Sequence, residues 1–364
     1  MDNLAAQKGF SVAWDMAAAF QFSGEPVFIE RFGHGHINET YAVYFKFEYS
    51  RPIRYIMQKI NTLVFRTPDK LMENIVSVTE YLRGKVAAAG GNPAREVLTV
   101  VPAKDGGFMA QDASGDYWRA YVFVEDATSY QTVERPELFY QSARAFGRFQ
   151  RLLDSYPAEK LHETIPDFHN TPKRFADFCA ATARDTTGRA AAVRKEIDFL
   201  MARESEYGHI TNMLASGEIP LRVTHNDTKL NNVMIDNQTG EGVCVIDLDT
   251  VMPGSALYDF GDSIRFGTNP AGEDERDLSK VVFRMDLYRQ YREGFLSEAN
   301  LTAKEVANLR LGAKLMTLEN AMRFLADHLN GDVYFRIQRE GQNLDRARTQ
   351  IKLAQEMEIQ FNDM

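Results

Sequence analysis

The spacing of apolar residues along the chain changes about one third of the way from its start. In the first part, apolar and polar residues alternate in short runs: EPVFIER (25–31), YAVYFKFE (41–48) and RYIMQKIN (54–61). Alternation with a period of two places successive side chains on opposite faces of a strand, so these runs predict β-strands. The run LMENIVSVTEYLRGK (71–85) has the three- and four-residue spacing of a helix instead. Further strands are predicted at residues 97–102, 107–111 and 118–124.

From about Pro136 the pattern changes to long helical repeats, such as ELFYQSARAFGRFQRLLD (137–154) and ANLRLGAKLMTLENAMRFLADHL (307–329). We therefore predict an α+β protein with two lobes. A β-rich N-terminal lobe takes residues 1–124, and a mainly helical C-terminal lobe takes residues 125–364. Short strands around residues 224–250 form an isolated β segment inside the helical part.

This β segment carries the densest group of polar residues, in the stretch THNDTKLNNVMIDNQTGEGVCVIDLDT. The apolar runs 233–235 and 243–246 flank NQTGEG, which predicts a β-hairpin with a loop longer than two residues. Folding the hairpin about its turn places Asn232 opposite Asp247, and facing residues of an antiparallel pair lie about 5 Å apart. An amide oxygen and a carboxylate at one place suit Mg²⁺, which takes one or two protein ligands together with phosphate oxygens and water.

Two further residues of the stretch fit phosphoryl transfer. Asp227 precedes Asn232 by five residues, and a carboxylate beside a metal–phosphate group can orient an acceptor hydroxyl and take its proton. Lys229 can neutralise the charge of the transferring phosphoryl group. The spacing of an Asp, an Asn five residues later and an Asp at a strand end is that of kinase catalytic loops.

Other interpretations of the same residues stay open. A polar loop before a hairpin is often only a solvated turn. Asp247-Leu248-Asp249 resembles the D-x-D metal site of nucleotide-sugar transferases, and His225 with Asp227 could ligate the metal of a hydrolase. We interpret His225 as a structural hydrogen-bonding residue. Asp259-Phe260-Gly261 spells a kinase metal motif but does not end a hairpin strand, so we interpret Asp259 as a carboxylate that braces a helix start or a loop.

The first lobe offers candidate nucleotide contacts. Gly33 and Gly35 lie between two predicted strands, where glycines let the backbone approach phosphates, although a plain hairpin turn explains them equally well. On the third strand, Gln58 and Lys59 point to opposite faces, so only one can face the nucleotide. Lys59 is the chemically attractive choice. Glu73 and Glu80, on the following helix, are possible partners for such a cation. Residues 122–125, which include Phe123 and Glu125, are predicted to form the inter-lobe hinge, where the backbone can pair with an adenine edge.

Composition limits the class of protein. With 42 Lys and Arg against 51 Asp and Glu, the formal net charge is −9, and no basic run occurs. This argues against nucleic acid as a partner, because phosphate backbones are bound by clusters of cations. Two isolated cysteines, Cys179 and Cys244, give no disulfide framework, so a cytoplasmic location is expected. The start, MDNLAAQKGF, lacks a signal-peptide pattern, and no run approaches the roughly 18 apolar residues of a membrane span.

Taken together, these motifs resemble the aminoglycoside phosphotransferase and choline kinase superfamily, and more narrowly the bacterial N-acetylhexosamine 1-kinases. The likeness extends over nearly the whole chain. The segments that carry it are GHGHINETY, RYIMQKIN, YVFVEDATSY, AFGRFQ, PLRVTHNDTKLNN, IDLDTVMPGSALYDFGDSIRFG, NAMRFLADHLNGDVYF and RTQIKLAQEME.

The resemblance implies a protein-kinase-like fold, with a nucleotide-binding first lobe and a second lobe for catalysis and substrate. It implies phosphorylation of the anomeric hydroxyl of N-acetylglucosamine or N-acetylgalactosamine by ATP with Mg²⁺. Asp227 matches the family's catalytic base, and Asn232 and Asp247 match its metal ligands. Four more residues are implied to line the sugar pocket: His36, Asp249, Phe266 and Arg323.

Other functions stay open, and they differ from sugar phosphorylation by ATP in the acceptor molecule, in the donor or in the absence of catalysis. An aminoglycoside or choline kinase belongs to the same reaction class, a nucleotide-binding pseudokinase would lack turnover, and a nucleotide-sugar transferase would consume a sugar nucleotide. The expected partners are a small sugar and a nucleotide, without nucleic acid or membrane, and the protein is expected to be a monomer or a homodimer.

Overall fold

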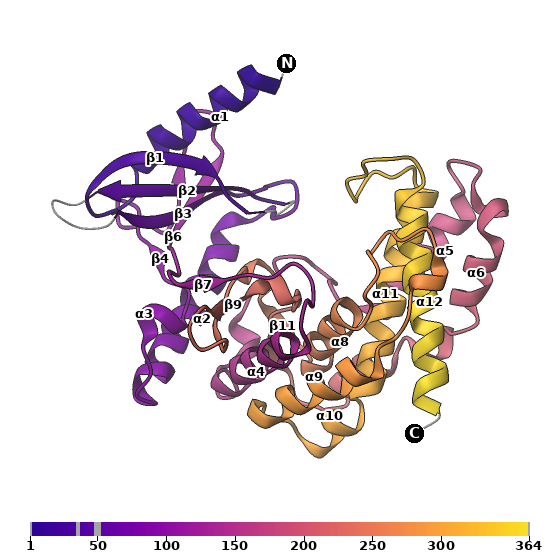
Figure 1. Ribbon diagram of the computed structural model, residues 1–364. Helices are drawn as coiled ribbons and strands as arrows, with labels where there is room; N and C mark the ends of the chain where they lie inside the picture. The colour runs from indigo at the N-terminus through magenta and orange to yellow at the C-terminus, as the bar shows by residue number, and fades with distance from the viewer. Residues whose placement is uncertain (1, 34–36, 47–51, 363–364) are drawn as a thin grey trace. The chain divides into compact units, whose positions relative to one another are not determined.

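The computed structural model describes residues 2–33, 37–46 and 52–362 and divides them into two compact units. The first unit contains Met1–Ala127, His162–Ile165 and Val243–Asp249; the second contains Thr128–Leu161, Pro166–Gly242 and Thr250–Met364. Figure 1 shows a sheet with few helices in the N-terminal, indigo part and mostly helices in the orange and yellow C-terminal part. The predicted α+β class, with a β-rich N-terminal lobe and a mainly helical C-terminal lobe, is confirmed.

The first unit is built on a six-stranded antiparallel sheet of order β1-β2-β3-β6-β4, with β5 also paired to β6. Its elements are α1 (Asp2–Ala17), β1 (Glu25–Arg31), β2 (Glu39–Lys46), β3 (Ile53–Lys59), α2 (Pro68–Ala88), α3 (Pro93–Glu96), β4 (Val100–Val101), β5 (Ala110–Gln111) and β6 (Tyr117–Val122). The strands predicted at 25–31, 54–61 and 118–124 and the helix predicted at 71–85 are confirmed, whereas the fourth and fifth strands are shorter than predicted. Residues 47 and 48, at the end of the second predicted strand, lie outside the described residues.

The sequence patterns predict no element for residues 2–17, which form α1. Ala13, Met16, Ala17 and Phe20 are buried against the sheet, and their spacing of three and four residues is helical. They cover one face of the sheet, on which Met57 and Trp118 also lie. Because side chains alternate along a strand, the neighbouring positions point to the opposite face.

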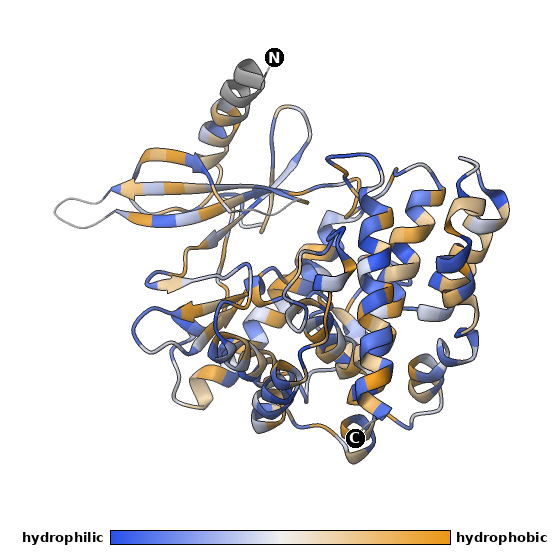
Figure 2. Ribbon diagram, turned by 45° about the vertical axis from the view of Figure 1, so that its right-hand side comes forward, coloured by the Kyte–Doolittle hydropathy of each residue, from blue (hydrophilic) through white to orange (hydrophobic). Residues whose placement is uncertain are grey.

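The second unit is mainly helical. Its helices are α4 (Pro136–Leu152), α5 (Thr171–Arg184), α6 (Arg194–Met201), α7 (His209–Ala215), α8 (Ala256–Gly267), α9 (Met285–Glu298), α10 (Ala303–Ala307), α11 (Leu309–Leu329) and α12 (Gln342–Asn362). Its strands are β8 (Arg222–Thr224), β9 (Val233–Asp236) and β11 (Met252–Gly254), while β7 (Ala127–Thr128) and β10 (Gly242–Val245) lie where the chain passes from one unit to the other. Figure 2 shows blue and orange residues mixed on individual helices of this part, as expected for helices with one buried side.

Helices α8 and α11 pack at very short range. A Cβ atom added at Gly312 of α11 would lie 2.6 Å from the carbonyl oxygen of Leu257 in α8, and Gly261 of α8 faces Gly312 at similarly short range. A side chain at either position would push the helices apart, so the two glycines fix the position of α8. None of the helices in the described part of the chain is both long and apolar enough to cross a membrane.

The predicted hairpin is present. Strands β9 and β10 flank a turn in which the Asp236 amide donates to the Glu241 carbonyl (2.8 Å) and the Gly240 amide to the Asp236 carbonyl (2.9 Å). Asn232 ends a short 3₁₀ turn, Leu230–Asn232, directly before β9, and Asp247 follows β10. Both residues therefore stand just outside the strand ends, Asn232 in the second unit and Asp247 in the first.

Candidate functional site

In the second unit, the loop between β8 and β9 brings three predicted site residues together. Lys229 Nζ lies 2.8 Å from Asp227 Oδ1. The side-chain nitrogen of Asn232 donates to the Asp227 carbonyl (2.8 Å) and to its carboxylate oxygen Oδ2 (3.1 Å). Because the amide hydrogens of Asn232 point to Asp227, its oxygen Oδ1 is the atom that can bind a cation.

The charges around Asp227 keep it ionised. Partial burial raises the pKa of Asp227, but the charge of Lys229, its hydrogen bond to Asp227 and the charge of Arg265 outweigh that effect and hold the pKa of Asp227 below the ordinary value. The charge of Asp227 in turn raises the pKa of Lys229, although this side chain is half-buried. The loop thus offers a carboxylate and a cation side by side, each in its charged form at neutral pH.

Helix α8 braces this loop with carboxylates. Asp259 accepts hydrogen bonds from the backbone amides of His225 (3.0 Å) and Asn226 (2.8 Å), and Asp262 accepts one from the amide of Thr228 (3.0 Å). Gln150 also donates to Asp259, at 2.7 Å. The interpretation of Asp259 as a bracing residue is confirmed, since its carboxylate is 1% exposed and bonded to the loop.

His225 is a structural residue, as predicted. Its ring is fully buried and packs edge-on against Phe146 and Phe149. Its Nδ1 accepts a bond from the Asp227 amide at 3.3 Å, and its carbonyl accepts one from the Thr250 hydroxyl at 2.7 Å. These bonds fix the backbone that leads into Asp227.

A second brace, which sequence analysis did not find, comes from His169 and Glu319. The two ring nitrogens of His169 lie 2.8 Å from Glu319 Oε1 and 3.3 Å from the carbonyl oxygen of Asn226. Thr171 donates to the other Glu319 oxygen (2.7 Å). Asn226 has a φ of 63°, a conformation more common for Asn than for most residues, so its backbone needs this support.

In the first unit, the two carboxylates of the Asp247-Leu248-Asp249 motif have different surroundings. Asp247 is exposed and has a φ of 60°. Asp249 is 4% exposed, and its oxygen Oδ1 lies 2.5 Å from Nη1 of Arg119, a residue of β6 that sequence analysis did not single out. The available signal was one charged residue inside the apolar run YWRAYV.

The sheet register places Gln58 and Lys59 on opposite faces, as predicted. Gln58 lies opposite Thr40 on one side and Arg119 on the other, and it is bonded to both side chains. Lys59 lies on the α1 side of the sheet and pairs with Asp116 at 2.5 Å, rather than with a carboxylate of α2. Gln58 therefore shares the face of Arg119, and a nucleotide contact by either Gln58 or Lys59 stays a prediction.

The remaining predicted nucleotide contacts lie in the first unit. Gly33 has a φ of 75°, which glycine adopts readily, whereas Gly35 and His36 lie outside the described residues. In the predicted hinge, the Phe123 amide donates to the Arg54 carbonyl (3.2 Å), and the Glu125 carboxylate pairs with the Arg54 guanidinium. These bonds order the hinge segment; its contact with an adenine stays a prediction.

Two of the residues that the resemblance places in the sugar pocket belong to the second unit. Phe266 is half-buried in α8. Arg323 of α11 is also half-buried, and its guanidinium lies 5.2 Å from the ring centre of Phe168 and 5.5 Å from that of Phe335. Aromatic rings on two sides hold the guanidinium in place. The sugar contact itself stays a prediction for both residues.

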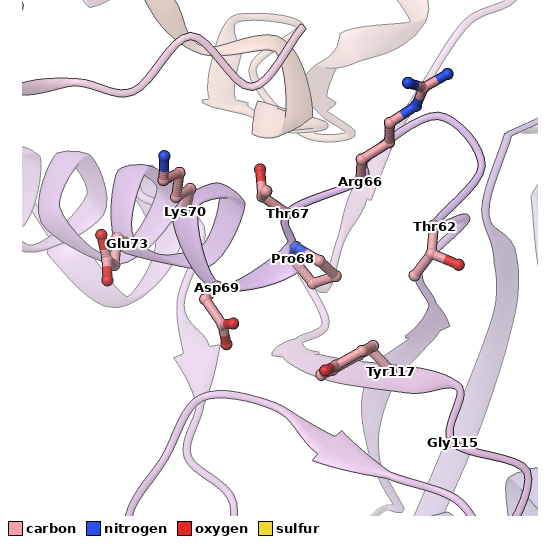
Figure 3. A pocket seen from close by; sticks show the side chains of 9 residues that line it. All are labelled: Thr62, Arg66, Thr67, Pro68, Asp69, Lys70, Glu73, Gly115 and Tyr117. Carbon is pink, nitrogen blue, oxygen red and sulfur yellow. The ribbon is translucent and has the colours of Figure 1, made fainter.

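A pocket of about 510 Å³ lies in the first unit, where the chain enters α2. Figure 3 shows Arg66 and Lys70 extending to one side of the start of α2 and Asp69 to the other, so the charged groups do not converge on one point. None of the predicted nucleotide-binding residues that the structure describes lines this pocket. It therefore adds no residue to the candidate site.

The oxygen atoms available to bind a metal ion favour a magnesium site. Within the described ranges, no group of three or more His, Cys, Asp or Glu is arranged to hold a metal ion. A magnesium ion needs no such group, because it is typically bound through one or two protein oxygens together with phosphates and water. The donors present, Asn232 Oδ1 and the Asp247 carboxylate, are of the oxygen type that Mg²⁺ prefers, and their role as metal ligands stays a prediction.

Comparison with solved structures shows the fold. The structure of a microcompartment-associated aminopropanol kinase is 16% identical and has a TM-score of 0.59 over 97% of this chain and 98% of that one. The amicoumacin kinase hAmiN is 13% identical, with a TM-score of 0.64 over 96% and 95% of the two chains. An aminoglycoside phosphotransferase from Alicyclobacillus acidocaldarius subsp. acidocaldarius is 11% identical, with a TM-score of 0.62 over 96% of each chain. The predicted protein-kinase-like fold is thereby confirmed.

The sequence itself shows the family. The sequence model of the phosphotransferase enzyme family, APH, matches residues 29–293, which include the end of β1, all of β2 to β11 and most of the described site. The match confirms the predicted class of enzyme, a small-molecule phosphotransferase with an alcohol group as acceptor, and the wider superfamily predicted from the motifs. The chain belongs to the phosphotransferase enzyme family.

Proposed function

We propose that the protein phosphorylates the anomeric hydroxyl of an N-acetylhexosamine, N-acetylglucosamine or N-acetylgalactosamine, using ATP and Mg²⁺. The observation that carries the proposal is the group of Asp227, Lys229 and Asn232 on one braced loop. The family assignment supports the reaction class. The acceptor is supported by the sequence segments that resemble N-acetylhexosamine 1-kinases.

In the proposed reaction, Asp227 holds the acceptor hydroxyl and takes its proton. The acceptor oxygen forms a bond to the γ-phosphorus of ATP, the bond from that phosphorus to the ADP oxygen breaks, and the proton passes to the Asp227 carboxylate. A carboxylate with a lowered pKa is a weak base, so Asp227 contributes mainly by orienting the hydroxyl. An anomeric hydroxyl suits such a base because it is more acidic than an ordinary alcohol.

Lys229 is placed to balance the charge of the transferring group, since its ammonium already lies beside the proton acceptor. Asn232 and Asp247 are the proposed ligands of Mg²⁺, which supplies charge neutralisation at the phosphate oxygens when bound. One structural neighbour, the amicoumacin kinase, was solved in complex with AMP-PNP and Ca²⁺, which supports a nucleoside triphosphate and a divalent cation as a pair.

A transfer assay tests the proposal. Purified protein is incubated with ATP and Mg²⁺ and a panel of free sugars, choline and an aminoglycoside, and the phosphorylated position is identified by NMR. We expect phosphate on the anomeric oxygen of an N-acetylhexosamine. Transfer only to choline or to the aminoglycoside would replace the proposed acceptor with another substrate of the same reaction class. Nucleotide binding without any transfer would indicate a pseudokinase and overturn the proposed activity.

A further inference from the structure

A fully buried cation in the first unit is paired with one of the two carboxylates that follow β10. The Arg119 side chain is 1% exposed and Asp249 is 4% exposed. Burying two charges is costly, and the cost is offset only when the pair has good geometry and its remaining donors and acceptors are satisfied. The surroundings of both side chains therefore show what the pair is built to do.

The Arg119 guanidinium has a carboxylate, an amide oxygen and an aromatic ring as neighbours, and its contact with Asp249 is an ion pair that lacks hydrogen-bond geometry. Nη1 lies 2.5 Å from Asp249 Oδ1. Nε and Nη2 donate to Oε1 of Gln58, at 3.0 and 2.8 Å, and the carbon of the guanidinium lies 5.3 Å from the ring centre of Tyr121. Burial lowers the pKa of Arg119, but the charge of Asp249, with a smaller contribution from Asp247, outweighs this and raises it. Arg119 is thus a buried cation paired with Asp249.

The other oxygens of Asp249 are also occupied. Oδ2 accepts a hydrogen bond from the Asn38 amide at 2.6 Å, and the Asp249 carbonyl accepts one from the Thr164 hydroxyl at 3.4 Å. Asn38 is itself fixed, because its Oδ1 accepts from the Asn61 amide at 3.0 Å. Both carboxylate oxygens of Asp249 therefore lie against protein groups, Oδ1 in an ion pair and Oδ2 in a hydrogen bond, whereas Asp247, two residues earlier, is exposed.

We propose that Arg119 is the built-in counterion of Asp249, so that Asp249 acts as a positioning residue and Asp247 alone of this pair serves as a cation ligand. This assignment rests on the proposed function, in which Asp247 binds the metal. It differs from the sugar contact that the resemblance implies for Asp249, and it separates this chain from a D-x-D site in which both carboxylates ligate. It also assigns a role to Arg119, the buried cation of the sheet, whereas its third-strand neighbour Gln58 carries no charge.

The decisive variant removes both charges at once. Arg119→Gln with Asp249→Asn keeps the local net charge and leaves amides that can bond to each other and to Gln58. Binding of Mn²⁺ to the full chain is measured by electron paramagnetic resonance in the presence of a non-hydrolysable ATP analogue, so no turnover is needed. We expect the Mn²⁺ affinity of the double variant to stay within about twofold of the unaltered protein, because no ligand is lost. Asp247→Asn should weaken the affinity by roughly fiftyfold or more, because a ligand is removed.

The two single variants should change the Mn²⁺ affinity in opposite directions. Arg119→Gln removes a positive charge near Asp247, so Mn²⁺ should bind about tenfold more tightly, whereas Asp249→Asn leaves Arg119 uncompensated and should weaken binding by about tenfold. A role in folding alone would lower the thermal midpoint without shifting the affinity in opposite directions. Should either single variant fail to fold, the neutral double variant decides the question by itself.

A matched control removes a different ion pair, in the second unit. Arg203 and Glu358 are paired through two hydrogen bonds of 2.8 and 2.7 Å, and Arg203→Gln with Glu358→Gln should leave the Mn²⁺ affinity unchanged. A double variant at Arg119 and Asp249 that loses Mn²⁺ as strongly as Asp247→Asn overturns the assignment, because Asp249 is then a ligand. Absence of Mn²⁺ binding to the unaltered protein would overturn the proposed function together with this assignment.

Discussion

The loop around Asp227 and the segment around Asp249 both place a carboxylate beside a cation, yet they differ in exposure and in the origin of that cation. The Asp227 side chain is 28% exposed, and its partner Lys229 comes from the same loop and is itself 34% exposed. Asp249 is buried, and its partner Arg119 comes from the sheet. An accessible pair can rearrange when a substrate arrives, whereas separating a buried pair leaves an uncompensated buried charge and is costly. Exposure and partner, more than residue type, thus distinguish Asp227, the proposed proton acceptor, from Asp249, the proposed positioning residue.

The two segments also differ in how their backbones are held. Asp259 and Asp262 of α8 accept the backbone amides of the Asp227 loop, so that helix sets the backbone and leaves the Asp227 side chain accessible. At Asp249 the carboxylate itself is bonded to the sheet and to Asn38. The first arrangement suits catalysis and the second suits positioning, and the predictions below test this contrast.

The largest effect is expected at Asp227. Asp227→Asn keeps the size of the side chain but removes the proton acceptor, so turnover should fall on the order of a thousandfold while the protein stays folded. Steady-state kinetics and circular dichroism check this outcome. Asp198→Asn, at an exposed ion pair of α6, is the matched control and should keep full turnover. Near-normal activity of Asp227→Asn would exclude this residue as the base.

Loss of the adjacent cation should be the next largest effect. Lys229→Met removes the charge that balances the transferring group, and turnover should fall about a hundredfold. Lys229 is also the strongest of the charges that lower the pKa of Asp227. Without it the protonated form of Asp227 is favoured, its pKa rises, and the acidic limb of the kcat/KM profile should move to higher pH. A profile that keeps its acidic limb would show that another group titrates there.

The brace on α8 should contribute less to turnover and more to stability. Asp259→Ala leaves two backbone amides and Gln150 without their acceptor, which should cost about 3 kcal/mol in the free energy of unfolding and lower turnover about tenfold. Urea unfolding and kinetics measure the two quantities. If cation affinity were lost while stability stayed intact, Asp259 would be the metal ligand that its Asp-Phe-Gly sequence suggests.

The smallest effect is expected at the outer brace. His169→Gln removes the ring that spans Glu319 and the Asn226 carbonyl, so we expect about 1 kcal/mol less stability and a severalfold lower turnover. His209, whose Nδ1 contacts the Glu206 carbonyl at the start of α7, provides the control variant His209→Gln. Equal behaviour of the two variants in thermal unfolding and in kinetics would show that the loop does not depend on His169.

Local patterns in the sequence predicted much of the fold. Strands at 25–31 and 54–61, the helix at 71–85 and the hairpin follow directly from apolar spacing and turn residues. Helix α1 was missed because its apolar positions become a helical stripe only once the sheet face that it covers is known. The short β4 was predicted too long for a similar reason, since the length of an edge strand is set by its partner β6.

The candidate site shows the same limit. Asp227, Lys229 and Asn232 are close in sequence, so their spacing predicted their grouping. Arg119 was missed because it is linked to Gln58 by the register of neighbouring strands and to Asp249 by a contact over 130 positions of the chain. Neither contact produces a regular spacing in the sequence from which it could be predicted. The role of Asp259 was predicted correctly, because the loop residues before it and the helical pattern after it exclude a strand end.

The close contact between Gly261 and Gly312 has a consequence for changing the acceptor range of the enzyme. Helix α8 carries both carboxylates that shape the Asp227 loop, and it cannot shift toward α11, because the backbone of each helix already touches the other. Directed variation should therefore succeed at half-buried side chains such as Phe266, a predicted sugar contact, which can be exchanged without displacing α8. Methyl groups introduced at the two glycines would instead displace Asp227, the proposed proton acceptor, and libraries that include these positions should be dominated by inactive clones.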